Sequence, residues 1–329
     1  DEAQGRVVGH WRAPWAAATR FGMGSNSGDR QVLLGEGGIA VVALDPGDVS
    51  RLLWQRPAVP AAHGLSPDGR WLVTGEGTQE LVWRDLDSDA EIRTDLGPGG
   101  WRCLTFSPDG RQLAASRLGT NEVVIVRTDT REVDVRLPQP GPIYLMAWSP
   151  DSQRWVGATQ DGRVFYQDVV GRNRILSFTF SPAMPTALAF DPLGRRVASA
   201  WDDRTVRVWD LMGGRMLVSG QGDSTEFGFT DQGGSFGPVL SRGSVGRFQL
   251  VPPVGFSELL AGYIGSSELE VEFSPDSGRV AGRHPAGVRV FGTEQGEWQA
   301  WVPLEFVKGF CFGRDPSRLV TVDRTGVAA

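Results

Sequence analysis

The feature that most constrains this chain is a repeated unit of about 40 residues. Large apolar residues recur at intervals of 39 to 44 positions, each at the end of a short apolar run. These anchors are Phe21, Leu65, Phe106, Trp148, Phe190, Phe229, Phe273 and Phe312. A period of about 40 to 45 residues is typical of repeats that each form a small sheet of four strands. Such a sheet cannot bury both faces alone, so every unit must pack against its neighbours.

The clearest copy of the unit is Met184–Asp210. It contains an apolar run that ends at Phe190, a second run at Val197–Ala200 and an alternating third run at Thr205–Trp209. Turn-forming residues separate the three runs, which predicts a meander of antiparallel strands.

The turn that follows the anchor has a recurring sequence. It reads SPDG at Ser66–Gly69 and Ser107–Gly110, SPDS at Ser149–Ser152 and Ser274–Ser277, and DPLG at Asp191–Gly194. Proline presets the backbone angle of the second position, and glycine accepts the left-handed conformation at the end of the bend. The tetrapeptide therefore predicts a tight hairpin between the first and second strands of these five units.

The residues Trp209 and Asp210, with Asp203 in the turn before their strand, resemble the signature of the WD-repeat (Trp-Asp repeat) β-propeller family, in a degenerate, bacterial-type form. The resemblance implies an all-β propeller of about eight four-stranded antiparallel blades, with residues 1–329 as a single domain. It also implies a buried His–Ser/Thr–Asp–Trp hydrogen-bond network. No unit carries this network complete, because the Gly9-His10 pair and the Trp209-Asp210 pair fall in different units.

The two ends of the chain are complementary in this scheme. Asp1–Gly9 reads as an outer strand, whereas Phe306–Ala329 reads as a blade that lacks one. We therefore expect the N-terminal strand to complete the last blade and close the ring, with Arg6–Gly9 paired near Gly326–Ala328. A seven-bladed alternative would require the weak sixth unit, Gly213–Pro253, to fold otherwise.

Composition excludes several classes of function. The net charge of −6 argues against a general nucleic-acid binder, and no apolar run approaches the roughly 18–20 residues of a membrane span. Cys103 and Cys311 are expected to be buried free thiols rather than a disulfide, which favours a cytoplasmic location. No cofactor or metal site is predicted. Because the first residue is Asp1, a leader or an attached effector domain elsewhere in the protein remains an expectation.

One acidic stretch resembles a calcium loop in part. Asp85, Asp87, Asp89 and Glu91 alternate as the oxygen ligands of such a loop do. The glycine needed at the sixth position is Ala90, and the twelfth position is apolar. A solvated turn between the third and fourth strands is the preferred interpretation.

Two classes of function fit this fold. The first is a non-catalytic scaffold or sensor module that binds a protein or peptide, within a larger protein or complex. The alternative is a propeller enzyme or small-ligand binder that uses the central channel, of the lactonase, quinone or transport- and peptidase-associated type. Glu226, Glu270 and Glu272 are the acidic residues that could serve the alternative.

The partner-binding residues are predicted from their place in the unit. Side chains four or six positions before an anchor, and those in the turn between the second and third strands, should surround the mouth of the channel. They are Trp15, Arg102, Arg117, Tyr144, Met184, Trp201, Asp202, Asp223, Arg242, His284, Phe306 and Lys308. Arg102 and Arg242 would supply charge-assisted hydrogen bonds, and Trp15, Tyr144 and Phe306 the apolar anchors.

Overall fold

The structure is a computed structural model, and it divides the chain into two compact units, Pro60–Gly220 and the combined segments Asp1–Val59 and Gln221–Ala329. The residues it describes are 11–12, 18–24, 29–35, 38–43, 51–76, 79–169, 174–179, 183–212, 214–221, 227–229, 235–240, 244–250, 255–260, 271–274, 276, 278–284, 287–292, 298–303, 307–313, 315, 317–323 and 327–328. Within these ranges the regular structure is entirely β-strand. No helix among them could cross a membrane.

The unit Pro60–Gly220 contains four sheets, each made of four consecutive antiparallel strands. The first sheet is β6 (Ala62–Leu65), β7 (Trp71–Glu76), β8 (Glu80–Asp85) and β9 (Glu91–Asp95). The second is β10 (Trp101–Phe106), β11 (Gln112–Arg117), β12 (Glu122–Arg127) and β13 (Val133–Pro138). The third is β14 (Ile143–Trp148), β15 (Arg154–Thr159), β16 (Arg163–Asp168) and β17 (Arg174–Thr179). The fourth is β18 (Pro185–Phe190), β19 (Arg196–Trp201), β20 (Thr205–Asp210) and β21 (Arg215–Gln221).

The other unit also contains four sheets of four strands. One is β2 (Ala18–Gly24), β3 (Arg30–Gly35), β4 (Gly38–Ala43) and β5 (Arg51–Arg56). The next are β22 (Phe227–Phe229), β23 (Ser235–Leu240), β24 (Ser244–Gln249) and β25 (Gly255–Leu260), then β26 (Val271–Phe273), β27 (Arg279–His284), β28 (Gly287–Gly292) and β29 (Trp298–Pro303). The last combines β30 (Val307–Phe312), β31 (Leu319–Asp323) and β32 (Val327–Ala328) with β1 (Trp11–Arg12).

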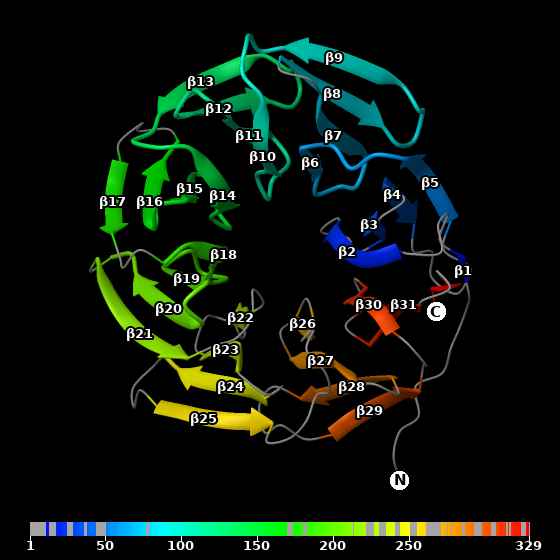
Figure 1. The fold of residues 1–329 in the computed structure, drawn as a ribbon, viewed down its shortest axis with the longest axis vertical. Helices are drawn as coiled ribbons and strands as arrows, with labels where there is room; N and C mark the ends of the chain where they lie inside the picture. Colours follow the sequence, from blue (N-terminus) through cyan, green and yellow to red (C-terminus); the bar gives the residue numbers. More distant parts are fainter. Residues whose placement is uncertain are drawn as a thin grey trace. The chain divides into compact units, whose positions relative to one another are not determined.

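The described strands thus form eight four-stranded antiparallel sheets, and the predicted architecture of propeller blades is confirmed. The sixth repeat, which the seven-bladed alternative required to fold otherwise, forms the four-stranded sheet β22–β25. That alternative is therefore wrong. In Figure 1, β6, β10, β14 and β18 are the innermost strands of their unit, and they contact one another in this order.

The hairpin turns follow the predicted chemistry. In the turn after β10, Gly110 has a φ of +72°, and the Ser107 hydroxyl donates to Asp109 Oδ1 at 2.6 Å. Ser152 occupies the glycine position of the third sheet with a φ of +59°, which costs conformational energy. Its hydroxyl compensates by accepting the Asp109 N–H of the second sheet at 3.0 Å. The turns therefore link neighbouring sheets as well as neighbouring strands.

The core lies between successive sheets. Trp83 of β8 and Trp101 of β10 are fully buried, and Trp83 meets Phe106 edge to face with ring centroids 6.0 Å apart. The third strands β12 and β20 are buried over four consecutive residues, because each sheet is covered on both faces. This explains why β12 reads as a continuous apolar run, and why the alternating strand β20 buries Arg207 together with its apolar residues.

The last sheet is completed by a strand from the start of the chain, as expected. Trp11 pairs with Ala328 and Arg12 with Val327 in an antiparallel ladder. The pairing strand is therefore Trp11–Arg12, whereas the expected strand, Arg6–Gly9, lies outside the described residues.

Candidate partner-binding site

Three successive inner strands carry the same irregularity at the same place. The register of β10 against β11, of β14 against β15 and of β18 against β19 shifts by one residue near the start of the strand. The extra residues are Arg102, Tyr144 and Thr186, each four positions before its anchor. A bulged residue leaves the ladder and can aim its side chain away from the sheet. The bulges therefore give a physical cause for the predicted ring of contact residues.

Thr186 was missed by the sequence reasoning. In that unit the residue six positions before the anchor, Met184, was chosen instead of the one four positions before it. The signal was present, because Arg102 and Tyr144 share the offset of four with Thr186. Lys308 occupies the same bulge in β30, although its side chain is not described.

Arg102 and Tyr144 form a pair that links the second and third sheets. The Arg102 guanidinium lies over the Tyr144 ring at 5.9 Å from its centroid, a cation–π contact. Arg102 is exposed, and within the described part of the chain no carboxylate pairs with it. The guanidinium is therefore held in place while its N–H donors remain available to a ligand.

The Tyr144 hydroxyl links the third sheet to the fourth by donating to the Pro185 carbonyl oxygen. Burial and the nearby Asp202 carboxylate raise the pKa of Tyr144 to about 12, against the opposing effect of Arg102. The hydroxyl is consequently protonated at neutral pH. Tyr144 is thus contacted on its ring by Arg102 and at its hydroxyl by Pro185.

Asp202 and Met184 are joined by two hydrogen bonds. The Met184 N–H donates to Asp202 Oδ1 at 2.8 Å, and the Asp202 N–H donates to the Met184 carbonyl at 2.9 Å. Asp202 is exposed, and its Oδ2 has no hydrogen-bond partner among the described residues. One oxygen of this carboxylate therefore fixes the side chain.

Arg117 does not lie on an exposed rim, because its side chain is buried. Its guanidinium donates to the carbonyl oxygens of Leu96, Gly97 and Pro98, at 3.2 Å for Leu96, and stacks on Trp101 at 5.3 Å. The side chain therefore holds the segment between β9 and β10 in position. It supports the start of β10 rather than contacting a partner.

Trp201 is also buried, and it belongs to a local hydrogen-bond network. The indole N–H groups of Trp201 and Trp209 both point to the Ser199 hydroxyl, at 2.8 and 3.4 Å. Asp203 accepts from Arg207 at 2.9 Å, and the Arg207 guanidinium lies 4.4 Å from the centre of the Trp201 ring. Ser199, Trp209 and Asp203 supply three residue types of the implied network, with Trp201 and Arg207 as additional partners.

The remaining predicted contact residues cannot be placed by their side chains. Trp15, Asp223, Arg242 and Phe306 lie outside the described residues. The backbone of His284 is at the end of β27, paired with Gly287, and the side chain is not described. The structure thus brings together Arg102, Tyr144, Met184 and Asp202 of the predicted set.

The stretch that partly resembles a calcium loop is bound by arginines instead. Asp85 is buried and accepts from Arg70 at 2.7 and 3.1 Å and from the Asp87 N–H at 3.0 Å. The hydrogen bond from Arg70 keeps the pKa of Asp85 well below its usual range. In the portion of the chain that is described, no three acidic, histidine or cysteine residues are grouped so that they could hold a metal ion.

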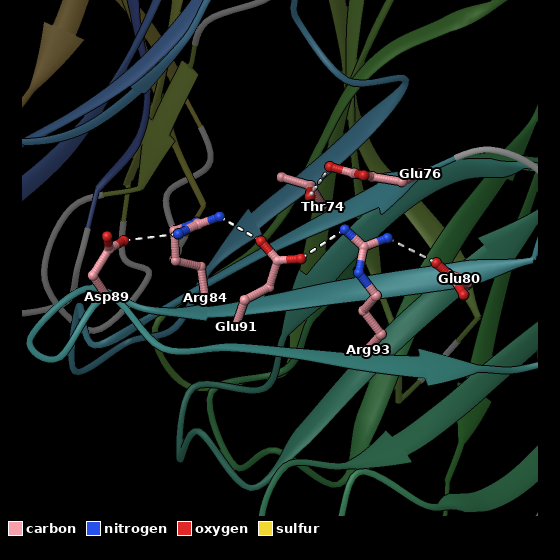
Figure 2. Close-up of polar contacts among 7 residues, drawn as sticks. All are labelled: Thr74, Glu76, Glu80, Arg84, Asp89, Glu91 and Arg93. Atoms are coloured by element: carbon pink, nitrogen blue, oxygen red, sulfur yellow. Dashed lines mark hydrogen bonds and ion pairs between the residues drawn. The ribbon is translucent and has the colours of Figure 1, made fainter.

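The other carboxylates of this region form a charge ladder along β8 and β9 (Figure 2). Arg84 contacts Asp89 at 2.7 Å and Glu91 at 2.5 Å, and Arg93 contacts Glu91 at 2.6 Å and Glu80 at 2.9 Å. The charges alternate, so each of the three carboxylates is ion-paired with at least one of the two arginines. The stretch is an ion-paired surface of the outer strands.

Of the three acidic residues considered for a site in the channel, the structure describes only Glu272. Glu226 and Glu270 lie outside the described residues. Glu272 in β26 accepts the Phe312 N–H of β30 at 3.3 Å. Its described contact is therefore structural, between two neighbouring sheets.

Comparison with known proteins agrees with this geometry. Residues 174–210, which span most of the fourth sheet of the unit Pro60–Gly220, match the family described as WD domain, G-beta repeat. The chain is 31% identical over 144 residues to WD repeat-containing protein SL1-17 of Schistosoma mansoni. It is 30% identical over 145 residues to Protein HIR1 of Candida albicans. It is 32% identical over 120 residues to Protein groucho of Drosophila melanogaster.

These alignments cover 43%, 44% and 35% of this chain and 46%, 13% and 16% of the respective relatives. The chain therefore spans less than half of the length of each of them. All three organisms are eukaryotes, so they lend no support to the expected bacterial type of repeat. The resemblance to WD-repeat β-propellers is supported by both the family match and the relatives.

Proposed function

We propose that this chain is a non-catalytic scaffold or sensor module that binds a protein or peptide. The observation that carries the proposal is the joined surface of Arg102, Tyr144 and Asp202, which three successive sheets contribute. Two exposed charged groups are held in fixed positions beside a half-buried tyrosine. Tyrosine and arginine are enriched among the residues that dominate binding energy at interfaces.

The alternative function in catalysis or small-ligand binding would use carboxylates or histidines that converge on the inner strands. At the bulges of β10, β14 and β18 the residues are instead arginine, tyrosine and threonine. These types suit the recognition of a peptide surface better than acid–base chemistry. A binding module is therefore favoured over an enzyme.

Further parts of the proposal concern the whole protein. The eight described sheets would be the blades of one closed ring and one domain, with β1 completing the last blade. The module would act in the cytoplasm, where cysteine thiols remain reduced, and Cys103 and Cys311 form no disulfide. An effector domain in the same protein or complex would receive the binding signal.

The test is a binding comparison between wild type and the single variants Arg102→Ala and Tyr144→Ala, with partners captured from the native host. Removing a dominant interface residue costs about 2 kcal/mol or more, so we expect binding to weaken roughly thirtyfold. Arg111→Ala is the matched control, because this exposed arginine lies at the other end of the same sheet. If both variants fold normally and retain every partner at full strength, the binding surface lies elsewhere.

A further inference from the structure

The surface of Arg102, Tyr144 and Asp202 has a fixed order of charge. The positive group belongs to β10, the tyrosine to β14, and the negative group to the turn after β19. Arg102 lies over the Tyr144 ring, the Tyr144 hydroxyl donates to Pro185, and the neighbouring Met184 N–H donates to Asp202. The order is therefore positive, aromatic, negative across three successive sheets.

Each charged group is immobilised by a contact that leaves its binding capacity open. Arg102 is held by stacking on Tyr144, a contact that does not use its N–H groups. Asp202 is held through Oδ1 by the Met184 N–H, and Oδ2 has no partner among the described residues. Groups that are fixed in advance lose less conformational entropy when a ligand binds.

We propose that this surface recognises an extended peptide segment of a partner protein that carries both an acidic and a basic side chain. The acidic side chain pairs with Arg102, the basic side chain pairs with Asp202, and the segment between them crosses the Tyr144 ring. The inference rests on the proposed binding function and adds the chemistry of the partner.

The charges favour a peptide over other ligands. A nucleic acid or another polyanion would meet the exposed Asp202 carboxylate, which repels it, and the net charge of the chain is −6. A peptide can present both signs within a few residues. Charge-assisted hydrogen bonds at both ends would then fix the direction in which the peptide lies.

The experiment selects binders from a displayed library of random dodecapeptides on wild type and on four variants. Tyr144→Ala removes the central ring, Arg102→Glu reverses one charge, and Asp202→Asn removes the other charge while keeping the oxygen that accepts from Met184. Arg111→Glu is the control with the same change of charge at the opposite end of the sheet. Thermal unfolding of every variant confirms that it is folded.

We expect wild type and Arg111→Glu to select peptides enriched in both an acidic and a basic residue. Arg102→Glu should lose the acidic enrichment, Asp202→Asn should lose the basic enrichment, and Arg102→Glu should weaken the best wild-type peptide about tenfold or more. Peptides that depend on Tyr144 but show no charge preference would overturn this inference and leave the proposed function standing. Selection that is unaffected by Tyr144→Ala, or that yields no binders, would overturn both.

Discussion

At the scale of single residues, the packing between the first two sheets of the unit Pro60–Gly220 depends on one glycine. Gly75 in β7 faces the fully buried Trp101 of β10. A Cβ atom at this position would lie 2.6 Å from Trp101 Cβ and 2.7 Å from two atoms of its indole ring. The tryptophan can occupy this space only because residue 75 has no side chain.

We therefore predict that Gly75→Ala lowers the free energy of unfolding by about 1–3 kcal/mol, the usual cost of overpacking. Urea unfolding followed by tryptophan fluorescence measures the change. Gly278→Ala is the control, since a Cβ there meets only the flexible Asp276 carboxylate at 3.5 Å. Equal stability of wild type and Gly75→Ala would show that Trp101 moves without cost.

The outcome for Arg117 shows what residue patterns could not predict. Its predicted place in the turn between the second and third strands indicated an exposed position, but Arg117 is the last residue of β11 and is buried. Its burial depends on carbonyl oxygens some 20 residues earlier, at Leu96 and Gly97, which no local pattern identifies. Tyr144 and Arg102, by contrast, were predictable because their bulge recurs at a fixed distance from the anchor.

At the scale of elements, the sheets protect their outermost strands in two ways. The pairings of β5, β13, β17, β25 and β29 each contain a register shift, which interrupts a regular edge. The pairing of β8 with β9 is regular, and this is the edge that carries the alternating ladder of Figure 2. Charged side chains on an outer strand discourage pairing with another chain. In this sheet the ion pairs therefore serve the protective role that a register shift serves in the other sheets.

The hairpin turns contain carboxylates that make the fold sensitive to acid. In Asp109 and Asp151 burial opposes ionisation, but hydrogen bonds from Ser107 and Ser149 and from backbone N–H groups outweigh it and lower the pKa. A carboxylate whose pKa is lower in the folded state stabilises the fold above its unfolded pKa of about 3.9. That contribution is lost as the pH falls through this value toward the folded pKa.

We predict that the free energy of unfolding declines below about pH 4, and that Ser107→Ala and Ser149→Ala each remove roughly 1 kcal/mol at pH 7 and flatten the decline. Urea unfolding at pH 7, 4 and 3 tests both parts. Ser88→Ala is the control, because this exposed serine lies in a turn but uses only its backbone N–H in the described contacts. An unchanged acid slope in the two variants would contradict the assignment.

The secondary structure of each unit was largely predictable, because the repeat period, the turn tetrapeptide and the apolar runs all indicate a four-stranded antiparallel sheet. The weak sixth repeat also forms four strands, although its turn reads TDQG at residues 230–233. The exact pairing at the chain end was not predictable, since Arg6–Gly9 and Trp11–Arg12 both have strand-like sequence. Only contact with Val327–Ala328 distinguishes them, and that contact is remote in sequence.

At the scale of the whole molecule, the two ends of the described chain meet in one sheet. Trp11–Arg12 supplies the outer strand of β30, β31 and β32, so the last sheet depends on residues more than 300 positions away. Without β1, the short strand β32 would become an exposed edge.

We predict that deleting residues 1–12 lowers the melting temperature by about 2–4 °C for each kcal/mol lost, and more than deleting residues 1–9. Differential scanning calorimetry on the two truncated forms and wild type makes the comparison. If the two truncations have equal effects, the stabilising strand is Arg6–Gly9 rather than Trp11–Arg12. An unchanged melting temperature in both would show that the N-terminal pairing contributes nothing.

This pairing also determines when the last sheet can form during translation. Trp11 leaves the ribosome 317 residues before its partner Ala328. At about 5–20 residues per second, β1 remains unpaired for roughly 16–60 s before β32 has been synthesised. The four sheets of Pro60–Gly220 are each built from consecutive strands and can form during that interval. A nascent chain therefore carries β1 unpaired while these sheets form, and any chaperone that assists this protein would have its longest task at Trp11–Arg12.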